Sequence, residues 1–291
     1  MIRSFNEKIA RQSELLQILI LDALYALSGS HGIIFQGGTA LRLVYGGPRF
    51  SEDLDFLSGI AENQIKRMLN KSFSKIEMGC VAQFGPGKLE LQIKEGREGA
   101  VKSFFVYRPE KQRGRIAVKV EFEEAIIGRE PAVNRFILRE LQVVSAVIIT
   151  GRLMLPYASS ILVAETADEI LADKIRAIYE RPYIKGRDVF DIWWLVSQLK
   201  LSPKMSLVRA TLGRYRQIFR PARNPGYFQT REAVSEIAQA LEADLPRFLP
   251  ADIFSFYREK QFHELIETTA VVTASLLNDG LEDALNAASE R

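Results

Sequence analysis

The chain has 291 residues, of which 47% are hydrophobic and 26% charged, and its formal net charge is +3. These values are typical of a globular protein with enough length for two modest domains. The single cysteine, Cys80, excludes an internal disulfide, and two histidines leave little material for multi-ligand zinc sites or Ser-His-Asp catalysis. The absence of Gly-Lys-Ser/Thr and of Gly-x-Gly-x-x-Gly argues against P-loop NTPases and dinucleotide enzymes.

The sequence also lacks the marks of membrane or export proteins. It contains no run of eighteen apolar residues, and its first residues do not form a signal-peptide pattern. We therefore expect a cytoplasmic protein without a membrane partner.

In chain order, helical spacing predicts a first helix over residues 13–27 and, after a short buried strand at 33–35, a second helix over 63–73. Strand-like runs follow at residues 81–84, 89–94, 104–107, 116–122 and 143–149. Gly-Pro-Gly-Lys at residues 85–88 predicts a hairpin turn. From about residue 161 the apolar spacing is mostly helical, with breaks at 182–186, 221–226 and 246–250. We expect an α+β fold, with a mixed sheet and flanking helices over residues 1–160 and a helical domain over residues 161–291.

A glycine pair follows the first short strand. The apolar run at 33–35 leads into Gly37-Gly38-Thr39, after which apolar residues recur at helical spacing. A strand, a glycine pair and a helix start let backbone amides approach a phosphate, and the helix N-terminus favours the negative charge. Thr39 can cap this helix and also bond a phosphate oxygen. A tight turn into a helix has the same composition, so the turn alone does not identify a phosphate site.

Two carboxylates, Asp53 and Asp55, follow fifteen residues after Gly38. In a strand, residues i and i+2 point the same way with Cα atoms about 6.5 Å apart, so Leu54 and Phe56 point into the core. Two ionised carboxylates at that separation repel by about 3 kcal/mol, and a partly buried pair needs a compensating cation. Mg²⁺, or Mn²⁺, meets that need because one or two carboxylates and substrate phosphates usually hold it. An edge strand with two solvated acids gives the same pattern.

Two later helical stretches carry a second set of charged residues. Thr166-Ala-Asp-Glu169 fits a capping box, and the apolar spacing that follows places Lys174 in the middle of a helix. Asp188 begins the next helix, and Asp191 lies one turn later on the same face. A surface lysine and a capping aspartate give the same pattern.

These motifs together resemble a known family. Gly37-Gly38-Thr39-Ala-Leu and Arg49-Phe-Ser-Glu-Asp53-Leu-Asp55-Phe are similar to the AbiEii/AbiGii nucleotidyl transferase toxin family, a branch of the DNA polymerase β-like nucleotidyltransferase superfamily. Ile170-Leu-Ala-Asp-Lys174 and Gly186-Arg187-Asp188-Val-Phe-Asp191 resemble that family's later lysine and aspartate motifs. The resemblance covers roughly residues 33–195. It implies a nucleotidyltransferase fold in which the helical domain contributes to the active-site cleft.

The resemblance also implies roles for individual residues. It assigns the metal to Asp53 and Asp55, catalytic roles to Lys174 and Asp188, and support to Asp191. Lys174 would reach the nucleotide phosphates as a point charge. The residues implied to bind the nucleotide, besides Lys174, are Gly37, Gly38, Thr39, Arg49 and Ser51.

The superfamily further implies a third acid on a neighbouring strand, where it would activate the attacking hydroxyl. Residues 115–123 alternate, so that Ile116, Val118, Val120 and Phe122 face one way and Ala117, Lys119, Glu121 and Glu123 face the other. Glu121 is our candidate for the catalytic acid. Glu123 is nearly as good on spacing, and an ordinary solvated strand face fits as well.

A basic segment lies between residues 201 and 231, which contain no Asp or Glu. Arg214, Arg216 and Arg220 are our RNA-binding candidates, since arginines interleaved with aromatic residues can track a phosphate backbone and stack unpaired bases. A solvated helix face with core aromatics fits the same composition.

We therefore expect metal-assisted transfer of a nucleoside monophosphate from a nucleoside triphosphate to an acceptor hydroxyl, with RNA such as a tRNA 3′ end as acceptor. If the family carries over, the protein is the toxin of a type IV toxin-antitoxin pair, and a separate antitoxin protein is its partner. A small-molecule nucleotidyltransferase and a non-catalytic nucleotide-binding or RNA-binding module are the alternatives.

Overall fold

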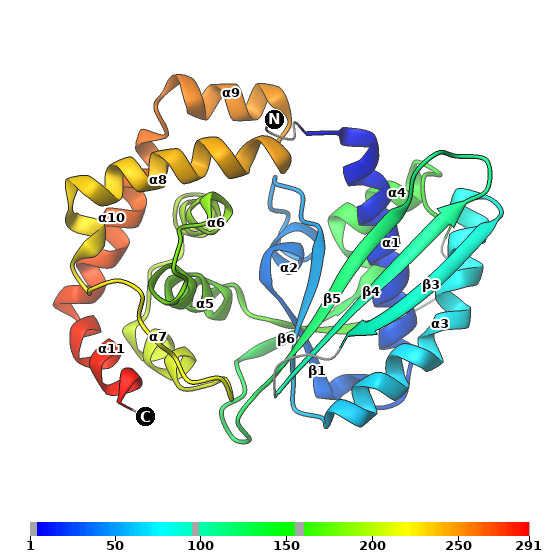
Figure 1. Ribbon diagram of the computed structural model, residues 1–291, viewed down its shortest axis with the longest axis horizontal. Helices are drawn as coiled ribbons and strands as arrows, with labels where there is room; N and C mark the ends of the chain where they lie inside the picture. The colour runs from blue at the N-terminus through cyan, green and yellow to red at the C-terminus, as the bar shows by residue number, and fades with distance from the viewer. Residues whose placement is uncertain (1–4, 95–98, 155–159, 291) are drawn as a thin grey trace. The chain divides into compact units, whose positions relative to one another are not determined.

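The computed structural model describes residues 5–94, 99–154 and 160–290. The chain divides into two compact units (Figure 1). We call Glu7–Ile127 with Ala132–Glu165 the sheet unit. Gly128–Pro131 and Thr166–Arg291, with Met1–Asn6, form the helical unit.

Within the described residues, seven strands form one mixed sheet in the order β3-β4-β5-β2-β1-β7-β6. Their bounds are β1 Ile33–Gln36, β2 Asp53–Ser58, β3 Gly87–Lys94, β4 Ala100–Pro109, β5 Ile116–Glu124, β6 Val133–Ile137 and β7 Ile161–Glu165. β2 runs antiparallel to β1 and parallel to β5, and β7 runs parallel to β1. The mixed sheet with flanking helices confirms the predicted α+β class.

The helices of the sheet unit are α1 Glu7–Tyr25, α2 Gly37–Leu43, α3 Glu62–Phe84 and α4 Gln142–Ile149, with 3-10 turns η1 Ser30–Gly32 and η2 Leu138–Glu140. α1 and α3 lie side by side and pack on the sheet (Figure 1). The Tyr25 ring of α1 contacts Phe56 of β2, and Phe56 stacks on Phe122 of β5. The Tyr25 hydroxyl lies 3.1 Å from the Ile33 carbonyl and 2.9 Å from that of Val163, which connects α1 to β1 and β7.

Alternation along β2 and β5 decides which side chains enter this core. Leu54, Phe56, Val118 and Val120 are fully buried, as the spacing predicts. Their neighbours in sequence point to the opposite face of the sheet, away from α1. The face that α1 does not cover therefore carries Asp53 and Asp55 of β2 together with Lys119, Glu121 and Glu123 of β5.

The helical unit contains α5 Ala167–Glu180, α6 Gly186–Ser197, α7 Met205–Leu212, α8 Arg231–Asp244, α9 Ala251–Glu259, α10 His263–Asn278 and α11 Leu281–Ser289, with 3-10 turns η3 Tyr227–Gln229 and η4 Leu245–Arg247. α6 packs between α5 and α8 (Figure 1). A Cβ on Gly186 would lie 2.5 Å from the Ala240 carbonyl oxygen, so only glycine allows α6 to start this close to α8. Thr166 caps α5 by accepting from the Glu169 amide, as predicted.

Several predicted elements are wrong. Residues 81–84 form the last turn of α3 instead of a strand, because the buried face continues through Ile76 and Cys80 at helical spacing. Gly85 then ends the helix with φ +83°, and residues 85–86 connect α3 to β3, which begins at Gly87, so residues 85–88 do not form a hairpin turn. Residues 142–149 form α4, in which Val144 and Val147 are the buried residues.

The region around residue 161 differs from the expected helical spacing as well. Residues 161–165 form β7, which pairs with β1 and β6, and the helices begin after Thr166. A short apolar run fits a buried strand and a helix equally, which explains the error. In the described part of the chain, no helix is both long and apolar enough to cross a bilayer.

Candidate active site

The charged face of the sheet unit centres on β2 and β5. Asp53 and Asp55 lie on one face of β2, and the parallel register places Asp53 opposite Lys119 and Asp55 opposite Glu121. The Lys119 Nζ lies 2.9 Å from Asp53 Oδ2 and 2.6 Å from Glu121 Oε2. Lys102 of β4 is a further partner of Glu121, with its Nζ 3.3 Å from Oε1. We call Asp53, Asp55, Lys119 and Glu121 the acid face.

The acid face is half-buried, and its charges shift one another's protonation. Burial alone would lower the pKa of Lys119, but the hydrogen bonds and charges of Asp53 and Glu121 outweigh it and raise the pKa above its usual value. Burial alone would raise the pKa of Glu121, but Lys119 and then Lys102 lower it. Lys119 is therefore a permanent cation and Glu121 a carboxylate at neutral pH.

The glycine pair before α2 borders this face. Gly37 has φ +77°, and a Cβ there would lie 2.9 Å from Asp55 Oδ2. A Cβ on Gly38 would lie 2.3 Å from an Arg49 guanidinium nitrogen. Arg49 is buried, and its Nη1 donates to the Phe50 carbonyl at 3.1 Å. A side chain at Gly37 would therefore displace the Asp55 carboxylate, and one at Gly38 would displace the Arg49 guanidinium.

Thr39 and Ser51 lie near the same strands but in other roles than expected. α2 begins at Gly37 with Gln36 as N-cap, so Thr39 does not cap it. The Thr39 side chain is buried, and its hydroxyl donates to the Asp53 carbonyl. The Ser51 carbonyl accepts a 2.8 Å hydrogen bond from Gln17 of α1. The capping prediction for Thr39 is corrected, whereas the predicted nucleotide contacts stay predictions.

The register separates the two candidates for the third acid. Glu121 pairs across the strands with Asp55, whereas Glu123 pairs with Leu57 and is exposed. Glu121 therefore lies beside the aspartates, and Glu123 lies two residue pairs further along the strands.

The helical unit holds Lys174, Asp188 and Asp191 together. The Lys174 Nζ lies 2.8 Å from Asp188 Oδ1 and 2.7 Å from Asp191 Oδ2. Arg181 pairs with the other oxygen of Asp188. The two aspartate side chains are 3% and 4% exposed and that of Lys174 is 11% exposed, so this buried ion cluster lies inside the helical unit. Lys174, Asp188 and Asp191 therefore belong to one network of ion pairs.

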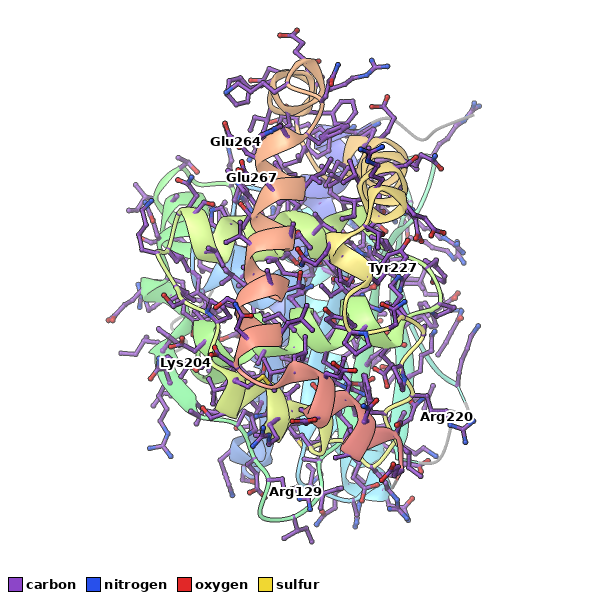
Figure 2. All side chains as sticks on the ribbon, turned by 90° about the vertical axis from the view of Figure 1, so that its left-hand side faces the viewer. Arg129, Lys204, Arg220, Tyr227, Glu264 and Glu267 are labelled. Atoms are coloured by element: carbon purple, nitrogen blue, oxygen red, sulfur yellow. The ribbon has the colours of Figure 1, made fainter. Side chains whose placement is uncertain are left out.

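The basic segment divides into buried and exposed residues. Arg214 is 1% exposed, and its Nη2 lies 2.6 Å from Glu169 Oε2. Arg216 and Arg220 are exposed, and Figure 2 shows Arg220 projecting away from the ribbon. The aromatic residues Tyr215, Phe219 and Phe228 are buried in the helical unit. Arg214 thus forms a buried ion pair instead of an RNA-binding surface, and these aromatics serve the core.

A metal ion would find oxygen ligands on the acid face. Within the described residues no set of three or more Asp, Glu, His or Cys side chains forms a ready-made metal cage. Mg²⁺ is usually held by only one or two carboxylates together with substrate phosphates and water, so Asp53 and Asp55 on one strand face fit it.

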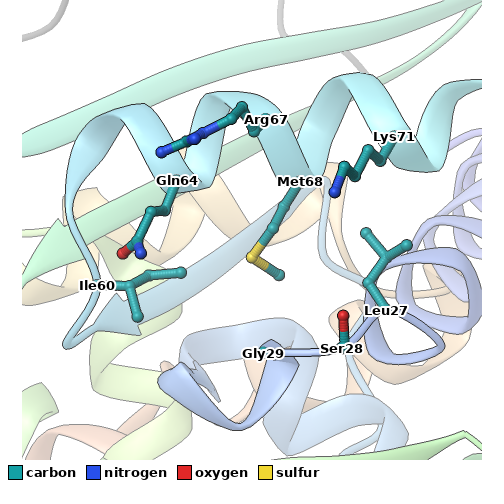
Figure 3. Close-up of a pocket in the computed structure, with 8 residues that line it drawn as sticks. All are labelled: Leu27, Ser28, Gly29, Ile60, Gln64, Arg67, Met68 and Lys71. Atoms are coloured by element: carbon teal, nitrogen blue, oxygen red, sulfur yellow. The ribbon is translucent and has the colours of Figure 1, made fainter.

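A separate cavity of about 330 Å³ lies beside the end of β2 that is opposite to Asp53. It is lined by Leu27, Ser28, Gly29, Ile60, Gln64, Arg67, Met68 and Lys71 (Figure 3). Ile60 lies two residues after Ser58, the last residue of β2, whereas Asp53 is the first. The cavity therefore does not belong to the acid face.

The motif search did not single out Lys119, although its partners were candidates. The sequence does indicate that Lys119 shares a face with Glu121, because side chains alternate along β5. The pairing of Lys119 with Asp53 depends on the β2-β5 register, which joins strands separated by two other strands and α3 in sequence.

Known proteins resemble this chain in sequence family and in fold. The family model for the nucleotidyl transferase AbiEii toxin of type IV toxin-antitoxin systems matches residues 19–267. No curated protein matches the sequence. The crystal structure of JHP933 from Helicobacter pylori has 19% identity and a TM-score of 0.55, and the match covers 98% of this chain and 99% of that one.

A second H. pylori structure, of a protein provisionally described as a nucleotidyltransferase, has 18% identity and a TM-score of 0.54. The match covers 94% of this chain and 98% of that one. At these identities the two structures support the fold alone. The family match, which spans most of the sequence, shows that this chain belongs to the AbiEii nucleotidyl transferase toxin family of type IV toxin-antitoxin systems.

Proposed function

We propose that this protein transfers a nucleoside monophosphate from a nucleoside triphosphate to an acceptor hydroxyl, and that the acceptor is RNA, such as a tRNA 3′ end. The observation that supports the transfer most directly is the acid face, where Asp53 and Asp55 of β2 lie beside Glu121 of β5. As in the family, the protein would act as a toxin that a separate antitoxin opposes.

In the proposed reaction the acceptor oxygen attacks the α-phosphorus, the bond from that phosphorus to the bridging oxygen breaks, and pyrophosphate leaves. Asp53 and Asp55 would hold Mg²⁺ or Mn²⁺, which supplies positive charge to the transferring phosphoryl group. Glu121, a carboxylate at neutral pH, would orient the acceptor hydroxyl for in-line attack and accept its proton as the new bond to phosphorus forms. Gly37 keeps the space beside Asp55 free of a side chain.

A role for the helical unit in the reaction depends on Lys174. Lys174 is held by Asp188 and Asp191 inside that unit, so its ammonium would have to serve the triphosphate while keeping these partners. The RNA-binding prediction now depends on the exposed Arg216 and Arg220. Changing both to Gln should weaken RNA binding at low salt more than at high salt.

The transfer is tested with purified protein, each of the four α-labelled nucleoside triphosphates and total cellular RNA, with Mg²⁺ or with a chelator. Asp53→Asn and Asp55→Asn should each lower incorporation of label about a hundredfold or more. Glu52→Gln is the matched control, because Glu52 is an exposed acid next to Asp53 and should transfer normally. Undiminished transfer by Asp53→Asn excludes the proposed metal role.

The same assay separates the alternatives. Label that mass spectrometry finds in small molecules instead of RNA supports a small-molecule nucleotidyltransferase. Nucleotide that binds without any transfer supports a non-catalytic module. Transfer that persists with chelator contradicts metal dependence.

A further inference from the structure

We propose that Lys119 is a built-in competitor of the metal: its ammonium holds Asp53 and Glu121 and has to leave their oxygens before a divalent ion can bind to the acid face. This inference rests on the proposed function, because it takes Asp53 as a metal ligand. Lys119 then sets how tightly metal binds, and acts as a positioning residue rather than a catalytic one.

The contacts of Lys119 show that its ammonium lies on oxygens that the metal would need. Its Nζ bridges two strands, at 2.9 Å from Asp53 Oδ2 and 2.6 Å from Glu121 Oε2. Both partners are carboxylates on the face where the metal is proposed to bind. An ammonium at hydrogen-bond distance from these oxygens and a divalent cation bound to them would repel each other strongly, since both are positive and only a few ångströms would separate them. Binding of the metal ion to Asp53 therefore disfavours the contact of the Lys119 ammonium with Asp53, and the reverse also holds.

The partial exposure of Lys119 allows its ammonium to leave these oxygens. Its side chain is 23% exposed, and the partners Asp53 and Glu121 are 25% and 32% exposed. The four-carbon stem is flexible, so the ammonium can move toward water without unfolding β5. A lysine side chain is a cation at neutral pH, so the ammonium competes with the metal as one positive charge against another.

Lys102 provides a matched comparison on the neighbouring strand. Its Nζ lies 3.3 Å from Glu121 Oε1, and its side chain is 41% exposed. No ion pair between Lys102 and Asp53 is found among the described residues. Removing the Lys102 charge should therefore change metal binding much less than removing that of Lys119, although both lysines contact Glu121.

The test measures Mn²⁺ binding to the full chain by calorimetry and by electron paramagnetic resonance of free Mn²⁺, at neutral pH and without nucleotide. Lys119→Met should bind Mn²⁺ about tenfold more tightly than the unchanged protein, a coupling of ordinary size between two ligands. The affinity of Lys102→Met for Mn²⁺ should stay within about threefold of that of the unchanged protein. Lys119→Gln repeats the test with a polar side chain in case the Met variant folds poorly, and thermal unfolding with and without Mn²⁺ checks both.

The outcomes separate this inference from the proposed function. If Asp53→Asn abolishes Mn²⁺ binding but Lys119→Met binds no more tightly than the unchanged protein, the competition is wrong and the metal site stands. If Asp53→Asn leaves Mn²⁺ binding unchanged, the proposed metal site fails and the inference fails with it. Tighter binding in both Lys119 variants, together with a larger Mn²⁺-induced rise in unfolding temperature, supports the competition.

Discussion

Each unit of this protein contains a lysine placed between two acids, and the two clusters differ in how deeply they lie. Lys174 of the helical unit bonds Asp188 and Asp191, whose side chains are 3% and 4% exposed. Lys119 of the sheet unit bonds Asp53 and Glu121, whose side chains are 25% and 32% exposed. The same chemical arrangement thus occurs once in the interior and once at a half-buried face.

The difference in burial decides what each lysine can do. A buried ion cluster has lost most of its hydration, so removing one partner leaves a charge with nothing to replace it. A half-buried cluster keeps water within reach, so its cation can exchange for another. We therefore expect the helical cluster to serve mainly stability, and the acid face to be the one whose cation can be exchanged.

Lys174→Met is the strongest way to test this contrast. The change leaves Asp188 and Asp191 buried without their shared ammonium, and we expect the free energy of unfolding to fall by about 3–5 kcal/mol. Lys119→Met should cost about 1 kcal/mol or less, because its partners remain near water. Urea unfolding of both variants measures the difference. Equal losses in the two variants would show that burial does not distinguish the clusters.

Gly37→Ala tests whether the acid face needs the space that Gly37 leaves beside Asp55. Gly37 has φ +77°, and the added Cβ would lie 2.9 Å from Asp55 Oδ2, so we expect a loss of about 1–2 kcal/mol together with reduced transfer. Gly59→Ala is the control, since its Cβ would meet nothing within 4 Å. Denaturant unfolding and the labelled-triphosphate assay measure both effects. A Gly37→Ala variant as active as Gly59→Ala would show that Asp55 tolerates displacement.

Glu121→Gln should give the smallest loss in the free energy of unfolding, and this loss should depend on pH. The folded protein lowers the pKa of Glu121, so the unfolded chain binds the proton more readily and this contribution to stability grows as pH rises. At neutral pH the variant should lose about 1 kcal/mol or less. The loss should fade as pH drops below the ordinary value of 4.5 and through the lowered pKa. Unfolding curves at several pH values check this, and a loss that is constant with pH argues against the Lys119 contact as its cause.

Local pattern predicted which residues of β2 and β5 enter the core. Alternation along β2 and β5 correctly placed Leu54 and Phe56 in the core and the charged residues opposite them. It failed where a short apolar run fits either structure, as in residues 81–84 of α3 and residues 161–165 of β7. The partner of Lys119 was beyond local pattern, because the β2-β5 register is set by contacts between distant parts of the chain.

The position of β7 matters for anyone who cuts this chain into fragments. β7 is the neighbour of β1 on the side away from β2, and it comes after most of the sheet has been synthesised. A product that stops at residue 160 would leave the backbone groups of β1 open along one side, which is a template for aggregation. Extending the fragment through Glu165 restores that neighbour, so solubility should change sharply over five residues of added length.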